Sequence, residues 1–133
     1  MSTDYTIEIT PQEQYLHVTV QGVYNLTNLK RLLTDIYAAC IDNNMNSVLV
    51  EDHLTGASLD IFELFDLIIL YSRKALSLRV KFAYVDIGSK RNKTVKAFAE
   101  QFSHIKGIEV KTFSKIEEAE QWLITSMRNV PQE

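Results

Sequence analysis

The sequence has few cysteines, little net charge and no long apolar run. Cys40 is its single cysteine and cannot form an internal disulfide, so nothing indicates a disulfide-stabilised secreted protein. The formal net charge of −3 argues against a general nucleic-acid-binding protein, which normally has a basic balance. The most apolar stretch, around residues 61–70, contains Glu63 and Asp66 and is too short to span a bilayer.

Targeting signals are also missing from the first residues. The segment 1–5 has neither a basic nor an apolar part, so we expect no signal peptide and a cytoplasmic protein. The 133 residues, 46% of them hydrophobic and 23% charged, fit one globular domain. We therefore expect a single domain over residues 1–133, with an ordered core at about 5–126 and a tail at 129–133.

Alternation of apolar and polar residues predicts two strands near the start of the chain. These strands, at residues 5–9 and 15–21, should pair as an antiparallel hairpin, and Gly22 should end the second. The later apolar runs are short and lie between turn signals, as is typical of strands buried on both faces of a parallel sheet. These three strands are predicted at residues 47–51, 79–86 and 108–113.

Apolar residues at helical spacing separate these strands. Asn25 or Thr27 can cap the first helix, and Ser58 or Asp60 the second, which follows a loop at 52–58. Four helices are predicted, at residues 26–40, 59–76, 90–105 and from Ser114 onward.

The last two helices carry further signals. Ser114 followed by Glu117 has the pattern of a capping box. In the third helix the core-facing residues are predicted to be Val95, Phe98, Ala99 and Phe102. Strands that alternate with helices imply right-handed crossovers. The predicted fold class is therefore a single-domain α/β protein with four helices and a mostly parallel sheet of about five strands, whose first strand is an antiparallel edge.

Four segments carry a resemblance to a known family. They are the hairpin end Gly22-Val23-Tyr24, the strand at 48–52, the Gly56 loop before an apolar helix, and the closing segment 117–123. With the order of elements, they make residues 5–126 resemble the SpoIIAA-like family. That family shares the STAS-type fold of anti-sigma-factor antagonists and is sometimes grouped with Sec14-type lipid-binding domains. The resemblance implies a regulatory or protein-interaction domain.

One motif of that family is missing. STAS antagonists carry an Asp-Ser-x-Gly phosphorylation motif at the start of the helix after the 48–52 strand. Here this region reads Ser58-Leu59-Asp60-Ile61. Because Asp60 already supplies a fixed negative charge near Ser58, the sequence argues against a switch operated by added phosphate charge.

Polar residues follow several predicted strands. Ligands of open parallel sheets bind beyond the carboxyl ends of the strands, so we interpret these residues as a ligand-binding or contact loop. The alternative is that they are helix caps and solvated loop residues. The candidates are Tyr24, Asn25, Asp52, His53, Thr55, Ser58, Ser89, Lys90 and Arg91.

A catalytic or metal site is not predicted. Asp52, His53 and Ser58 have the side chains of a hydrolase triad, but the Gly-x-Ser-x-Gly elbow is missing. His17 and His104 show no ligand spacing with the cysteine or with carboxylates. We therefore expect no enzyme, no metal and no cofactor.

The helix at 59–76 has more apolar residues than one core-facing stripe needs. It is either a well-covered core helix, a surface for a protein partner or for self-association as a homodimer, or one wall of an apolar pocket. The first hypothesis is a non-catalytic regulatory or protein-interaction domain, and the second is a carrier of a small apolar, lipid-like or anionic ligand. The candidate interface residues are Phe62, Phe65, Ile69 and Leu70.

Overall fold

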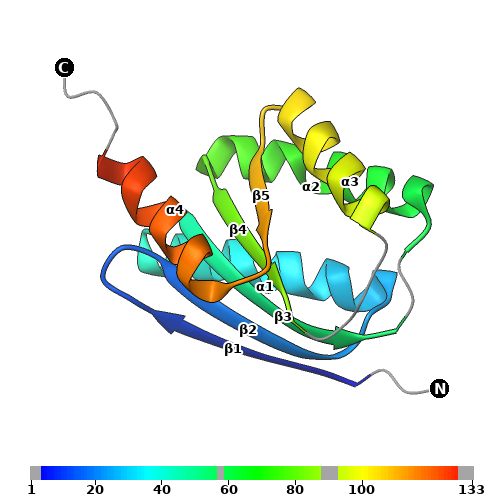
Figure 1. The fold of residues 1–133 in the computed structure, drawn as a ribbon, viewed down its shortest axis with the longest axis horizontal. Helices are drawn as coiled ribbons and strands as arrows, with labels where there is room; N and C mark the ends of the chain where they lie inside the picture. Colours follow the sequence, from blue (N-terminus) through cyan, green and yellow to red (C-terminus); the bar gives the residue numbers. More distant parts are fainter. Residues whose placement is uncertain (1–3, 57–58, 88–92, 129–133) are drawn as a thin grey trace.

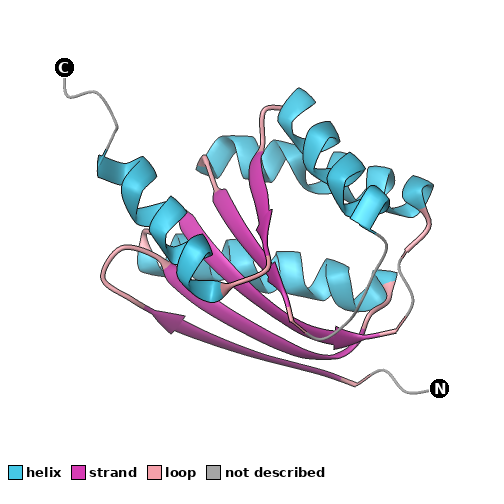
Figure 2. Ribbon diagram, viewed as in Figure 1, coloured by secondary structure: helices cyan, strands magenta, loops and turns pink. Residues whose placement is uncertain are grey.

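The computed structural model describes residues 4–56, 59–87 and 93–128, except for the side chains of 93–95 and 126–128. Helices and strands alternate after an opening hairpin (Figure 2). The elements in this part of the chain are β1 (Tyr5–Pro11), β2 (Leu16–Val23), α1 (Leu26–Asn43), β3 (Ser47–Thr55), α2 (Ile61–Leu78), β4 (Lys81–Asp86), α3 (Lys93–Ile105), β5 (Glu109–Phe113) and α4 (Ile116–Arg128). The predicted order of elements is confirmed.

The five strands form one sheet in the order in which they occur in the chain. β1 pairs antiparallel with β2, and the remaining neighbours are parallel, as predicted. Because right-handed crossovers that advance in one direction return on the same side, α1, α2 and α3 share one face of the sheet. We call it the inner face; α4 crosses the opposite, outer face (Figure 1).

The main core lies between the inner face and its helices. Leu16, Val18 and Val20 of β2 point inward together with Val48 and Val50 of β3, and all are buried. They pack with the α1 residues Leu29, Leu32, Ile36, Tyr37 and Cys40. Full burial of each such side chain contributes about 1.5–3 kcal/mol, so this cluster fixes α1 on the sheet.

A smaller core lies under α4. Ala119 and Leu123 of α4 are fully buried against Leu49, Ala83 and Val85. The helix crosses β3, β4 and β5. Within the described residues, the outer face of β1 and of the end of β2 is left to solvent.

Several boundaries differ from the predictions, and two of them lie where β2 pairs with β3. Gly22 does not end β2, because the strand runs on to Val23, and the predicted loop at 52–58 is wrong in its first half, because β3 continues to Thr55. The parallel pairs Gly22↔Leu54 and Val23↔Thr55 satisfy the backbone of both extensions. The polar side chains of residues 52–55 are typical of a loop, but in the structure these residues belong to β3.

The helix starts resolve the alternatives that the sequence left open. Asn25 caps α1, and Asp60 caps α2 in a full capping box with Glu63. Helix α4 begins at Ile116, two residues after Ser114. The prediction that Phe98 faces the core is wrong. The Phe98 side chain is 45% exposed and contacts the ring of Phe65 where α2 and α3 meet at the surface.

Gly22 offers a sharp test of the extended β2. Its φ is +132°, and a Cβ there would lie 2.1 Å from the backbone oxygen of Asp4. At Gly56 φ is +124°, but the nearest atom, the backbone oxygen of Tyr24, would be 3.7 Å away. We expect Gly56→Ala to cost about 1–3 kcal/mol from backbone strain alone, and Gly22→Ala to cost at least about 2 kcal/mol more.

Urea denaturation followed by circular dichroism measures both losses. Equal losses for the two variants would contradict the close approach of the Asp4 backbone to β2.

Candidate functional site

Backbone and side-chain bonds join the predicted contact residues at the ends of β2 and β3. The backbone N–H of Tyr24 donates to the carbonyl of Thr55 at 2.8 Å. Asn25 Oδ1 accepts from the backbone N–H of Asn28, also at 2.8 Å. Tyr24, Asn25 and Thr55 therefore lie close together at this edge of the sheet.

Asn28 locks this edge, and sequence reasoning missed it. Its side chain is fully buried, and its Nδ2 donates to the carbonyls of Val23 at 2.7 Å and Asp4 at 3.1 Å. The Asn28 side-chain amide thus connects the first turn of α1 with the end of β2 and with Asp4, the residue before β1. An asparagine at a core-facing helical position was the available signal, since such a group is buried only when it is hydrogen-bonded.

Asp52 and His53 do not act together, because adjacent strand residues point to opposite faces of the sheet. Asp52 points inward and is fully buried, where its Oδ1 accepts from the backbone N–H of Leu54 at 2.7 Å. The Tyr84 hydroxyl donates to its other oxygen. His53 points outward, so these two residues cannot belong to one catalytic triad.

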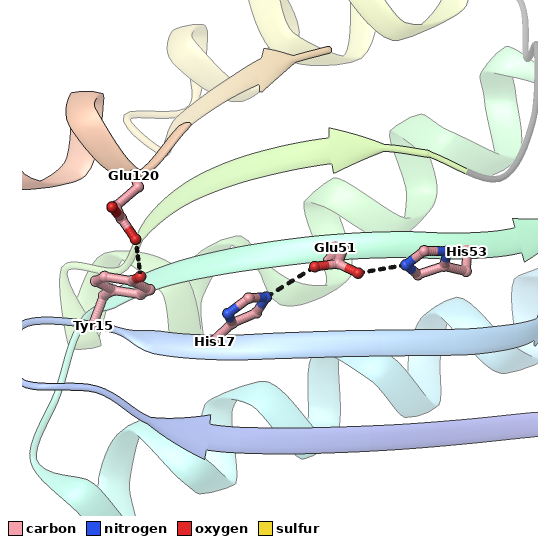
Figure 3. A network of polar contacts seen from close by, with 5 residues as sticks. All are labelled: Tyr15, His17, Glu51, His53 and Glu120. Carbon is pink, nitrogen blue, oxygen red and sulfur yellow. Dashed lines mark hydrogen bonds and ion pairs between the residues drawn. The ribbon is translucent and has the colours of Figure 1, made fainter. Parts of the chain in front are cut away.

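On the outer face, His53 belongs to a cluster that spans β2 and β3 (Figure 3). Glu51 lies between two imidazoles: His53 Nε2 is 2.5 Å from its Oε2, and His17 Nε2 is 3.1 Å from its Oε1. Because a carboxylate only accepts, both Nε2–H groups donate to it. Burial acts to raise the pKa of Glu51, but the hydrogen bonds from His53 and His17 outweigh it and hold that pKa below its ordinary value.

A second hydrogen bond on this face joins the hairpin to α4. The Tyr15 hydroxyl donates to Glu120 Oε2 at 2.6 Å (Figure 3). Burial and this acceptor raise the pKa of Tyr15 to about 12. The phenol therefore stays neutral at physiological pH and acts as a donor.

Polar groups also lie at the carboxyl end of the inner face. Asp86 is the register partner of Asp52, and Lys96 Nζ lies 2.6 Å from Asp86 Oδ2. Glu100 accepts from both the backbone N–H and the hydroxyl of Thr112, at 3.0 and 2.9 Å. These residues also escaped sequence reasoning, because their partners belong to elements distant in the chain.

Beneath α2 lies a cavity of about 190 Å³, which we call the α2 cavity. The helix packs against its neighbours α1 and α3 and stands away from the sheet. The cavity wall is mainly apolar, and its polar members include Lys96, Glu100, Ser103 and Thr112. The main apolar contributors are Leu29, Leu32, Leu33 and Tyr37 of α1, Leu64, Leu67, Ile68 and Tyr71 of α2, and Phe82, Ile108 and Val110 of the sheet side.

The remaining candidates divide between solvent and residues outside the described ranges. Phe62 is 70% exposed, Leu70 61% and Ile69 51%, whereas Phe65 is half-buried against Phe98 and Phe102. Ser58, Ser89, Lys90 and Arg91 lie outside the described residues. No helix within the described ranges is long and apolar enough to cross a membrane.

Comparison with known proteins identifies the fold. No family model matches the chain, and no curated protein matches it in sequence. Among solved structures, a variant of RsbS from Moorella thermoacetica is 14% identical, with a TM-score of 0.53 over 92% of this chain and 97% of that one. The protein TM1081 is 16% identical, with a TM-score of 0.55 over 93% of each chain.

A third solved structure is that of the anti-sigma factor antagonist SpoIIAA in its unphosphorylated form. It is 12% identical, with a TM-score of 0.50 over 96% of this chain and all of that one. The chain therefore has the SpoIIAA-like, STAS-type α/β fold, as the resemblance in sequence implied.

The Glu51 cluster has a pH signature. Because the pKa of Glu51 is lowered in the folded protein, its contribution to stability is complete above about pH 4.3, the ordinary glutamate pKa. It is lost as the pH falls through the lower, folded value. Glu51→Gln should therefore reduce the free energy of unfolding by about 1 kcal/mol at pH 6, and the difference from wild type should shrink in acid.

Unfolding of both proteins in urea between pH 3 and pH 7 measures this difference. Glu8→Gln, at an exposed residue of β1, is the matched control and should remain close to wild type throughout. A Glu51→Gln loss that does not change with pH would refute the assignment to the carboxylate.

Proposed function

We propose that this chain is a non-catalytic regulatory domain that acts by binding protein, with α2 and the β3 end before it as the contact surface. The observation that carries the proposal is the exposure of Phe62, Ile69 and Leu70 on one helix. Large apolar residues scattered singly over a surface are ordinary, but a contiguous group of them marks an interaction site. The fold is consistent with this role, since SpoIIAA is an anti-sigma factor antagonist.

The arrangement of the polar residues supports a non-catalytic role. Asp52 is engaged by Tyr84 and by the backbone of Leu54. His53 is held by Glu51 on the other side of the sheet. A general base must reach the proton it removes, and because Asp52 and His53 point to opposite faces of the sheet, they cannot act together on one nucleophile.

Photo-crosslinking tests the contact surface. The photo-reactive residue p-benzoylphenylalanine replaces Phe62 in the protein expressed in its source cells, and the adducts are identified by mass spectrometry. We expect a protein adduct at position 62 that is lost when Ile69→Glu is added, because a buried charge disrupts an apolar interface.

The same probe in place of Ile41, a residue of α1 that is also exposed, is the control and should give no such adduct. Absence of any protein adduct specific to position 62 would refute the proposed contact surface. Purified wild-type and Phe62→Glu proteins should have similar stability, since Phe62 contributes little to the core.

A second candidate function is favoured by the α2 cavity: a carrier or sensor of a small apolar ligand, which could carry an anionic group. A ligand pocket needs apolar walls and a few polar groups that orient the ligand. The cavity offers apolar side chains from three helices and the sheet, with Lys96 in its wall. The carrier hypothesis requires a space of this kind beneath α2.

Filling the cavity tests the carrier hypothesis. Native mass spectrometry of the purified protein, and titration with cis-parinaric acid as an apolar carboxylate probe, should show non-covalent binding. Ala99→Leu narrows the cavity and should abolish that binding, whereas Ala38→Leu on the exposed side of α1 should preserve it. No retained mass and no binding of the probe would eliminate the carrier function.

A further inference from the structure

The exposed apolar surface of α2 continues onto α3. Phe62, Ile69 and Leu76 are exposed at seven-residue intervals on α2, and Phe98 and Ile105 are exposed at the same interval on α3. Between them, Phe65 contacts the rings of Phe98 and Phe102, with centroids 5.3 and 4.5 Å apart. A Cβ on Gly107 would lie 3.1 Å from Leu76 Cδ2, so the two helices also meet at the other end. We call this surface the α2–α3 strip.

Folding alone does not account for this strip. The side of α2 that faces the protein already has its own apolar residues, including the buried Leu67 and Ala75. Phe62 at 70% and Ile105 at 79% exposed contribute almost nothing to the core. Water must therefore solvate this apolar surface unless something covers it, at a cost of about 25 cal/mol for each Å².

The charges along α2 indicate what covers the strip. Acidic residues, Glu63 and Asp66, lie in the first half of the helix, and basic residues, Arg73 and Lys74, lie in the second half. Asp66 and Arg73 lie beyond the first and last turns, where the helix dipole has little effect. No ion pair to either is recorded from any residue that the structure describes.

This pattern is complementary to itself when one copy of the helix is reversed. The midpoint of Ile61–Leu78 falls between Ile69 and Leu70. A twofold axis at that point places Ile69 of one copy beside Leu70 of the other. It also places Asp66 of each copy opposite Arg73 of the other. A twofold interface needs such a self-complementary surface.

We propose that the α2–α3 strip binds a second copy of this chain, with the two α2 helices packed antiparallel and two Asp66–Arg73 ion pairs across the axis. Phe98 and Ile105 extend the apolar contact from α2 onto α3. The inference rests on the proposed function, because it names the partner of the same surface. Binding of a different protein would not require acidic and basic residues of α2 to lie at equal distances on either side of the centre of the helix.

Charge reversal tests the register of the pair. The full-length wild-type protein should show a monomer–dimer equilibrium in sedimentation over about a hundredfold range of concentration. Asp66→Arg and Arg73→Asp each place like charges opposite one another twice, so each should raise the dimer dissociation constant about tenfold or more. The double variant restores opposite charges and should return to within about threefold of wild type.

Two further variants distinguish loss of the dimer interface from loss of the folded structure. Ile69→Glu should abolish the dimer, whereas Ile41→Glu, at a residue of similar exposure on α1, should leave the dissociation constant unchanged. Circular dichroism and urea unfolding confirm that each variant is folded, which is expected because all four positions are exposed.

Three results would overturn the inference: a wild-type monomer at every concentration, single reversals that dimerise as well as wild type, or a double variant that is not rescued. A monomer whose position 62 nevertheless crosslinks to a different protein would overturn self-association and leave the proposed interaction function standing. A monomer with no adduct at all would overturn both.

Discussion

The right-handed crossover is the constraint on which the rest of this structure depends. The parallel strands follow one another in chain order, so all three crossover helices must return on the same face of the sheet. Helix α2 packs against α1 and α3 instead of resting on the strands. The inward side of α2 therefore lines a cavity. Its outward side carries several apolar residues that are exposed to solvent. Both candidate functions arise from this one feature.

Strand geometry also explains why Asp52 and His53 of β3 do not belong to one catalytic triad. Strand alternation sends Asp52 to the crowded inner face and Glu51 and His53 to the outer face, where α4 covers only part of the sheet. On the inner face the carboxylate must be satisfied, and Tyr84 and the Leu54 backbone do so. On the outer face the imidazoles of His17 and His53 are partly exposed, and both donate to the carboxylate of Glu51. The polar groups on each face therefore have hydrogen-bond partners on that same face.

Much of the fold was predictable because its signals are local. Helical spacing gave the four helices, alternation gave the hairpin, and the order of elements gave a mostly parallel sheet. Two of the wrong boundaries, at Gly22 and at residues 52–55, lie where parallel pairing between β2 and β3 overrides residue preference. Helical spacing predicts that Phe98 faces the core, but this spacing does not show whether a neighbouring element covers the side chain.

The site was less predictable because it depends on contacts between distant residues. Tyr24, Asn25 and Thr55 could be grouped, since strand ends at one edge of a sheet are neighbours by topology. The roles of Asn28, Tyr84 and Lys96 depend on partners from other elements, and no spacing in the sequence indicates them.

The apolar excess of α2 was visible in the sequence, yet its meaning required the structure, because helical periodicity alone does not show how many sides of a helix are covered. Here the residues divide into two sets: Leu64, Leu67 and Ile68 line the cavity, whereas Phe62, Ile69 and Leu76 face solvent. Because no residue belongs to both sets, substitutions of the exposed residues leave the cavity wall unchanged, so the two candidate functions can be tested separately within a single helix.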